Sequence, residues 1–205
     1  MSDIVVISGS PANPSSTDAL LAHASAHLRA EGHRIAELRV RDLPGGEMLA
    51  GDSSHPDLAQ ALDTVARSQA VVLGSPVYKA SYTGLLKAFV DLLPMDAFTG
   101  RPVLPFLTGG SPAHVLALDY GLKPLAVTLG ATHVADGRFV LSHAIDKHAA
   151  DPNAVLIDPE AAGSVRLALE AFHAELAHRE CVGALVTPAP AAQSAPRTEL
   201  SEVLS

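Results

Sequence analysis

The sequence is poor in the residues that build disulfide frameworks, metal centres and nucleic-acid-binding surfaces. Its single cysteine, Cys181, excludes an internal disulfide framework and a zinc site made of cysteines. Asp and Glu outnumber Lys and Arg by 22 to 14, and no basic cluster offsets the formal net charge of −8. This balance argues against nucleic acid as a partner. With no tryptophan and three tyrosines, each tyrosine carries more information than usual.

The sequence also lacks long hydrophobic runs. No apolar stretch reaches membrane-spanning length, and the first residues show neither a basic segment nor a long apolar one, so we expect no signal peptide and no membrane partner. Apolar residues make up 48% of the chain and charged ones 18%, which is typical of a globular protein rather than a disordered one. We therefore expect a soluble, cytoplasmic protein.

Short apolar runs alternate with segments of helical spacing over the first 180 residues. The predicted strands are residues 4–7, 35–40, 70–74, 102–107, and a fifth that joins 132–134 to 138–141 with a bend at Asp136 and Gly137. The predicted helices are residues 20–28, 56–67, 85–93, 112–129 (interrupted at Gly121 and Pro124) and 160–179. This alternation predicts an α/β fold with a five-stranded, doubly wound parallel sheet in the order 2-1-3-4-5. Residues 41–56 and 142–158 are predicted to be irregular.

The composition changes near the end of the sequence. From Ala184 onward it is rich in Ala, Pro, Thr and Ser and shows no apolar periodicity. We therefore expect one domain over residues 1–184 and a flexible tail over 185–205.

Three polar loops follow strands one, three and four, at residues 8–17, 75–83 and 108–111. In the order 2-1-3-4-5 these strand ends are neighbours, and ligands of such sheets bind at this edge. The first loop precedes a helix, whose amino end favours a phosphate. It carries hydroxyl groups on Ser10, Ser15, Ser16 and Thr17. The alternative, that these side chains only cap the helix, stays open.

Common nucleotide motifs are absent from the first loop. No Gly-Lys-Ser/Thr follows it, and only Gly9 stands where the dinucleotide fingerprint needs several glycines. The other two loops offer backbone N–H groups, small residues and aromatic faces, which together with a phosphate site are what FMN requires. Taken singly, each loop could be an ordinary turn.

Four segments carry a family resemblance. They are Gly9-Ser10-Pro11, the run from Pro76 to Lys87, Leu92-Leu93-Pro94, and the run from Thr108 to His114. Together they resemble the NADPH-dependent FMN reductases, most closely the reductases of two-component alkanesulfonate monooxygenase systems, through about residue 180. The sequence departs from this family at Ala12, where many members have an arginine.

The resemblance implies a flavodoxin-like fold in which hydride passes from NADPH or NADH to FMN. It places the phosphate on Ser10, Ser15, Ser16 and Thr17. It places the flavin ring against Pro76, Val77, Tyr78, Lys79 and Ala80 of one loop and Thr108, Gly109, Gly110 and Ser111 of another. Reduced FMN would then pass to a separate flavin-dependent monooxygenase that cleaves sulfonates. Because the cofactor carries the chemistry, no catalytic side chain is assigned. The alternatives are a flavodoxin-like electron carrier and a quinone or azo reductase.

Tyr120 lies in the predicted helix after strand four. On its own, a tyrosine there is most simply packed at a helix interface. In the sulfonate-linked reductases a matching tyrosine is an insertion that makes a π-helix at a tetramer interface, so the resemblance implies a homo-tetramer (or dimer) and a role for Tyr120 in flavin release. π-Bulges tend to occur at functional sites.

The ten histidines do not predict a metal site. His23 and His27 stand one helical turn apart, a spacing that suits zinc, but no third ligand is evident. We interpret them as part of a solvated helix face.

Overall fold

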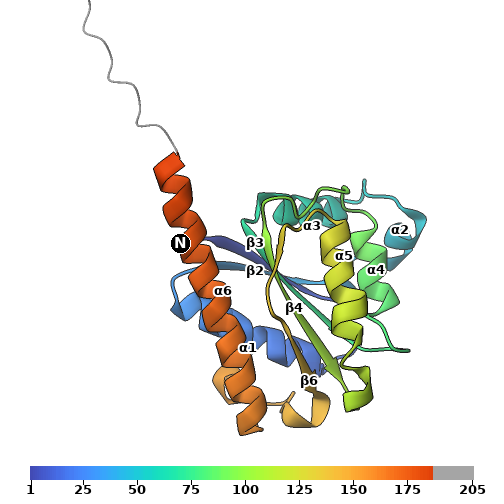
Figure 1. Ribbon diagram of the computed structural model, residues 1–205. Coiled ribbons are helices and arrows are strands. Elements are labelled where there is room, and N and C mark those ends of the chain that lie inside the picture. Colours follow the sequence, from blue (N-terminus) through green and yellow to red (C-terminus); the bar gives the residue numbers. More distant parts are fainter. Residues whose placement is uncertain (187–205) are drawn as a thin grey trace, which may run out of the picture.

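A parallel β-sheet in the order β2-β1-β3-β4-β5 forms the centre of the molecule, and a sixth strand also pairs with β4. The computed structural model describes residues 1–186 (Figure 1). Its strands are β1 (Asp3–Ser8), β2 (Arg34–Arg39), β3 (Ala70–Pro76), β4 (Pro102–Gly109), β5 (His133–Val134) and β6 (Arg138–Leu141). All ladders between them are parallel. The predicted flavodoxin-like, doubly wound fold is confirmed.

Helices cover both faces of the sheet. Figure 1 shows α1 (Ser16–Ala30) and α6 (Pro159–Val186) on one face, and α2 (Gly45–Ala50), α3 (Pro56–Arg67), α4 (Gly84–Val90) and α5 (Lys123–Thr128) on the other. Alternate strand residues enter the two cores because side chains alternate along a strand. Val5 and Ile7 belong to the core beneath α3 and α4, and Ile4 and Val6 to the core beneath α1 and α6.

The fifth strand position is divided, as the bend at Asp136 and Gly137 predicted. The N–H of Ala135 donates to the carbonyl oxygen of Val103 at 2.8 Å. Alternate residues of a strand face the same neighbour, so Pro105, which has no N–H to offer, also faces this side. A Cβ on Gly137 would lie 1.8 Å from the carbonyl oxygen of Pro105. Pairing is therefore interrupted opposite the proline, and only glycine fits there.

The prediction of an irregular segment at 41–56 was partly wrong. It contains the end of a 3₁₀ turn, Val40–Asp42, and the short helix α2. Gly45 and Gly46 at its start have poor helix propensity, so local sequence does not indicate a helix. Burial of Met48 in the core that includes Phe89 of α4 stabilises it instead.

The helix predicted over 112–129 is three shorter elements. A 3₁₀ turn (Pro112–His114) comes first, then a π-helix (Leu118–Leu122), then α5. Gly121 lies in the π-helix and Pro124 in the first turn of α5, so the predicted interruptions fall on either side of the boundary between these two elements. The π-helix that the resemblance implied around Tyr120 is confirmed.

Two helix ends differ from the predictions. Helix α4 ends at Val90, before Leu93, and α6 continues to Val186, past the predicted helix end at 179 and the predicted domain boundary at 184. The rest of the predicted tail, residues 187–205, lies outside the described residues. Within residues 1–186, every helix is too short or too polar to cross a membrane.

Candidate functional site

Three loops meet at the carboxyl edge of the sheet and are hydrogen-bonded to one another. The hydroxyl of Thr83, in the second loop, donates to the carbonyl oxygen of Gly9 in the first at 2.6 Å. The N–H of Val77 donates to the carbonyl oxygen of Thr108, in the third loop, at 2.7 Å. Oγ1 of Thr17, at the start of α1, lies 2.6 Å from Oγ1 of Thr108. The predicted convergence of the three loops is confirmed.

The first loop leads into the amino end of α1 with its hydroxyl groups turned inward. Oγ of Ser15 accepts the N–H of Asp18 at 3.1 Å and donates to Oγ of Ser10 at 2.7 Å. Both serines are buried. The N–H groups of Ser16 and Thr17 stand in the first turn, where a helix offers them no acceptor. Hydroxyls and backbone donors at the positive end of a helix dipole suit a phosphate.

An arginine that sequence reasoning missed supports this loop from the side of β2. Nη1 of Arg41 donates to the carbonyl oxygens of Ala12 at 2.9 Å and Ser10 at 3.3 Å, and lies 2.5 Å from Oδ2 of Asp18. The other carboxylate oxygen of Asp18 accepts the hydroxyl of Ser8 at 2.5 Å. No motif indicates Arg41, because only the pairing of β2 with β1 brings it to the loop.

The second loop turns sharply after β3. The N–H of Tyr78 donates to the carbonyl oxygen of Ser81 at 2.9 Å, and the reverse bond measures 3.2 Å. Between them Lys79 and Ala80 have φ angles of 50° and 63°. Each costs roughly 1–2 kcal/mol, because a Cβ is unfavourable in the left-handed region. The turn leaves the side chain of Tyr78 half exposed.

Thr83 fixes the second loop against the first. Its Oγ1 accepts the N–H of Leu86 at 3.1 Å and so caps α4, while its own N–H donates to Oγ of Ser75 at 3.0 Å. Gly9 passes so close to α4 that a Cβ on it would lie 2.6 Å from Cβ of Leu86. Thr83 is absent from the predicted site, although a threonine before an apolar helical segment is a recognised N-cap signal.

The third loop contains two glycines, one packed against a neighbouring side chain and one with free space beside its Cα atom. A Cβ on Gly109 would lie 2.8 Å from the ring of Phe139 in β6, whereas none of the described residues lies within 4 Å of a Cβ on Gly110. Oγ of Ser111 accepts the N–H of Ala113 at 3.3 Å and caps the 3₁₀ turn that follows. Gly110 is exposed and leaves its backbone open to a flat ligand.

Tyr120 projects from the π-helix into solvent. Its side chain is 80% exposed, and Leu116 and Val127 are also largely exposed on the same stretch of chain. Tyr120 is therefore not packed within its own chain. A group of exposed apolar side chains on one segment is typical of contact with another protein chain.

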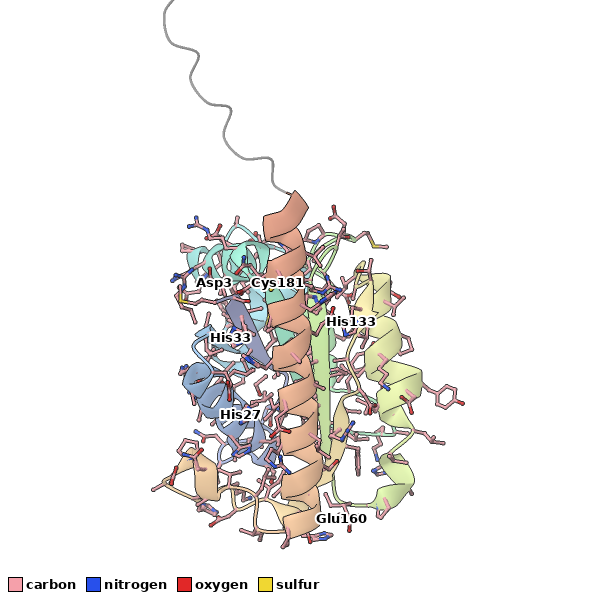
Figure 2. All side chains as sticks on the ribbon, turned by 60° about the vertical axis from the view of Figure 1, so that its left-hand side comes forward. Asp3, His27, His33, His133, Glu160 and Cys181 are labelled. Atoms are coloured by element: carbon pink, nitrogen blue, oxygen red, sulfur yellow. The ribbon has the colours of Figure 1, made fainter. Side chains whose placement is uncertain are left out.

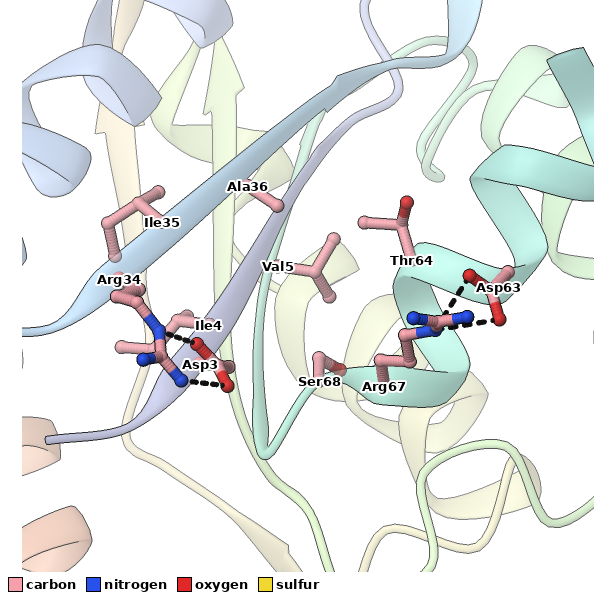
Figure 3. Close-up of a pocket in the computed structure, with 10 residues that line it drawn as sticks. All are labelled: Asp3, Ile4, Val5, Arg34, Ile35, Ala36, Asp63, Thr64, Arg67 and Ser68. Atoms are coloured by element: carbon pink, nitrogen blue, oxygen red, sulfur yellow. Dashed lines mark hydrogen bonds and ion pairs between the residues drawn. The ribbon is translucent and has the colours of Figure 1, made fainter.

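A cavity beside β1 and β2 lies at the opposite end of the sheet. It measures about 460 Å³ and is lined by residues at the start of both strands (Figure 3). Its cations are already paired, Arg34 with Asp3 and Arg67 with Asp63. Hydrogen bonding from Arg34 holds the pKa of Asp3 below its usual value. Since its charges are balanced and its position is remote from the three loops, we do not consider this cavity the candidate site.

The histidines do not assemble into a metal centre. Figure 2 shows His27, His33 and His133 at separate places on the molecule. Among residues 1–186, no three His, Cys, Asp or Glu side chains are grouped to hold a metal ion. The interpretation of His23 and His27 as a solvated face was wrong, because both are half-buried and Nδ1 of His23 bonds the carbonyl oxygen of Pro152 at 2.9 Å.

Comparison with known proteins identifies the family. The sequence model of the family of NADPH-dependent FMN reductases matches residues 2–146. The chain belongs to this family. The reductase is 36% identical over 178 residues to the FMN reductase (NADPH) of Pseudomonas putida, covering 86% of this chain and 89% of that one. It is 38% identical over 152 residues to the NADH-dependent FMN reductase SfnF of Pseudomonas putida, covering 71% and 80%.

A solved structure supports the same identification. The apo form of the NADH:FMN oxidoreductase EmoB superposes with a TM-score of 0.78 at 39% identity, covering 85% of this chain and 90% of that chain. The reductase is thus an NAD(P)H:FMN oxidoreductase with FMN and a reduced nicotinamide nucleotide as its cofactors. The donor set at α1 and the open backbone at Gly110 fit a phosphate and a flat ring, respectively.

Proposed function

We propose that this reductase supplies reduced FMN to a separate flavin-dependent monooxygenase that takes sulfur from sulfonates, and that it does so in the cytoplasm, where NAD(P)H is available. Two segments support this role, Pro76 to Ala80 and Leu118 to Pro124, because they resemble the reductases of alkanesulfonate systems. A separate partner requires flavin that can leave, so the site must bind FMN without trapping it.

The connection among the three loops is the observation that carries the proposal. It brings the hydroxyl groups at the start of α1 beside the third loop, which supports a phosphate position next to a ring position. The phosphate would lie on Ser10, Ser15, Ser16 and Thr17. The ring would lie on Pro76, Val77, Tyr78, Lys79 and Ala80 on one side and on Thr108, Gly109, Gly110 and Ser111 on the other. Bound FMN supplies the acceptor for the hydride of NAD(P)H, and these residues bind and orient it.

The exposed surface around Tyr120 supports a homo-tetramer, or a dimer, in which the π-helices meet. An interface there would remove the exposed side chains of Tyr120, Leu116 and Val127 from water. Only the 3₁₀ turn and residues 115–117 separate the π-helix from the third loop along the chain, so its packing would influence how firmly the ring is held.

Steady-state assays with NADPH and with NADH, each with and without added FMN, test the proposal. The expected result is a nearly colourless purified protein whose NAD(P)H oxidation saturates in free FMN. Addition of an alkanesulfonate monooxygenase and its substrate should then release sulfite. A protein that stays yellow and is inert to NAD(P)H would instead be an electron carrier. One that needs a quinone or azo dye as acceptor would belong to the other alternative.

A further inference from the structure

Arg41 is a residue of the site region that the proposed FMN contacts do not include. The first loop, residues 8–17, contains no Lys or Arg of its own. Arg41 reaches it from the 3₁₀ turn after β2, and its side chain is only 16% exposed. We propose that Arg41 is a positioning residue for the FMN phosphate, acting through the loop backbone and Asp18. This inference rests on the proposed FMN site.

The first part of the argument concerns the loop backbone. Arg41 holds the carbonyl oxygen of Ala12 at 2.9 Å and that of Ser10 at 3.3 Å. In a trans peptide the C=O and the following N–H point in opposite directions. Holding the carbonyl of Ala12 toward Arg41 therefore turns the N–H of Asn13 away from the guanidinium. Arg41 thus fixes the direction of this backbone donor and of the loop on both sides of Pro11.

The second part concerns charge. Asp18 lies in the first turn of α1, the helix whose amino end would receive the phosphate. An unpaired carboxylate there would repel a phosphate that carries up to two negative charges. Nη1 of Arg41 lies 2.5 Å from Oδ2 of Asp18, and both side chains are largely buried, so solvent screens the pair little. Arg41 offsets the charge of Asp18, while the second carboxylate near its Nε, that of Asp42 at 3.7 Å, is exposed to solvent. The helix dipole and the hydroxyls are then left to attract the anion.

This role predicts a dependence on the phosphate that a purely structural role would not show. Loss of Arg41 should weaken the binding of FMN but not of riboflavin, which has the same ring without the phosphate. Arg41 contacts the first loop and not the residues proposed to hold the ring, so KM for FMN should rise while kcat changes little.

The experiment measures Kd for FMN and for riboflavin by quenching of flavin fluorescence in the wild type, Arg41→Ala, Arg41→Gln and Arg41→Lys. Arg67→Ala is the matched control, because Arg67 also pairs with an aspartate but lies on the exposed surface of α3. We expect about a tenfold rise in Kd for FMN in the Ala and Gln variants, a smaller rise in the Lys variant, and less than a twofold change for riboflavin. Arg67→Ala should match the wild type.

Equal binding of FMN by the wild type and Arg41→Gln would overturn the inference while leaving the proposed function intact. An equal loss of FMN and riboflavin would also overturn it. If Arg41→Ala does not fold, the Gln and Lys variants carry the same comparison. A wild type that neither binds FMN nor oxidises NAD(P)H with it would instead refute the proposed function itself.

Discussion

The hydroxyl oxygen of Thr17 lies 2.6 Å from that of Thr108, although 91 positions separate the two residues in the sequence. Both residues are about 1% exposed. This bond joins the start of α1 to the end of β4 across β1 and β3, so the first and third loops keep a fixed separation. It is the longest-range contact among the three loops, and its removal tests whether the loops form one unit.

Thr108→Val should lower the free energy of unfolding by about 1–3 kcal/mol, because it leaves the hydroxyl of Thr17 buried without its partner. The double variant Thr17→Val and Thr108→Val should lose less than the sum of the single variants, since no orphaned hydroxyl remains. Urea denaturation of the four proteins measures this coupling. Strictly additive losses would mean that the two hydroxyls do not act as a pair.

Alanine substitutions at Gly110 and Gly137 should have separate effects, the first on flavin binding and the second on the free energy of unfolding. Gly110→Ala places a methyl group in open space, so its free energy of unfolding should stay within about 1 kcal/mol of the wild type. Its Kd for FMN should nevertheless rise about fivefold, because the methyl group occupies the proposed ring position. Flavin titration and thermal unfolding measure the two effects.

Gly137→Ala is the contrasting variant. Its Cβ would overlap the carbonyl oxygen of Pro105, so we expect a loss of about 3 kcal/mol or more in the free energy of unfolding. If Gly110→Ala bound FMN as tightly as the wild type, the ring would not lie on the third loop.

Tyr120→Ala should change whether flavin stays with the protein. We expect purified Tyr120→Ala to retain FMN and to oxidise NADPH more slowly with free FMN. The reason is that the proposed interface would keep the third loop in a geometry from which FMN can dissociate. Absorbance of the purified protein and steady-state kinetics measure this, and size-exclusion chromatography reports the assembly. Leu167→Ala is the control, since Leu167 is also an exposed apolar residue but lies on α6. Weak flavin binding and oxidation rates equal to the wild type would contradict this role.

His33 should make stability depend on pH. The N–H of Ser2 donates to Nδ1 of His33 at 3.2 Å, so the ring proton is on Nε2, which lies 3.0 Å from Nδ1 of His173. Figure 2 shows His33 beside α6, which carries His173. Burial, and then the charge of His173, lower the pKa of His33. Nε2 of His173 in turn lies 3.7 Å from Glu31.

The unfolded chain binds this proton near pH 6.5 and the folded chain only at lower pH. Between these values the unfolded state holds more protons, so stability should fall as the pH drops below about 6.5. His33→Asn should flatten this fall between about pH 7 and pH 5, as measured by urea unfolding. Hydrogen bonds from the N-terminal ammonium and Ser2 lower the pKa of nearby Glu180, so it titrates below this range. An unchanged slope in His33→Asn would exclude His33 as the cause.

Much of the architecture followed from the sequence, because the apolar runs are short and end in polar loops. The three polar loops and the break at Gly137 follow from local residues, whereas the strand order and the meeting of the loops follow from the doubly wound fold that the alternation of strands and helices predicts. Helix α2 was missed because Gly45 and Gly46 disfavour a helix that only the burial of Met48 stabilises. The π-helix at Tyr120 came from family resemblance, since an inserted residue has no signature in helical periodicity.

The parts of the site that were missed depend on contacts between distant segments. Arg41 lies 23 positions from Asp18, and its role appears only when β2 is placed beside β1. The sequence indicates that Thr83 caps a helix, but it does not indicate the bond from Thr83 to Gly9, which requires the packing of α4 against the first loop. The sequence shows that Arg41 and Thr83 can donate hydrogen bonds, and only the fold shows which acceptors they reach.

Each of the three loops is hydrogen-bonded to both of the others, so a displacement of one loop would strain the bonds to the other two. Loops that are joined in this way would lose little further entropy on binding, so the entropy lost on association would fall mainly on the ligand. The proposed exchange of flavin in each turnover would gain from such pre-organisation. The residence time of the flavin would then depend on its contacts with the loops, including the third loop, which precedes the π-helix that carries Tyr120.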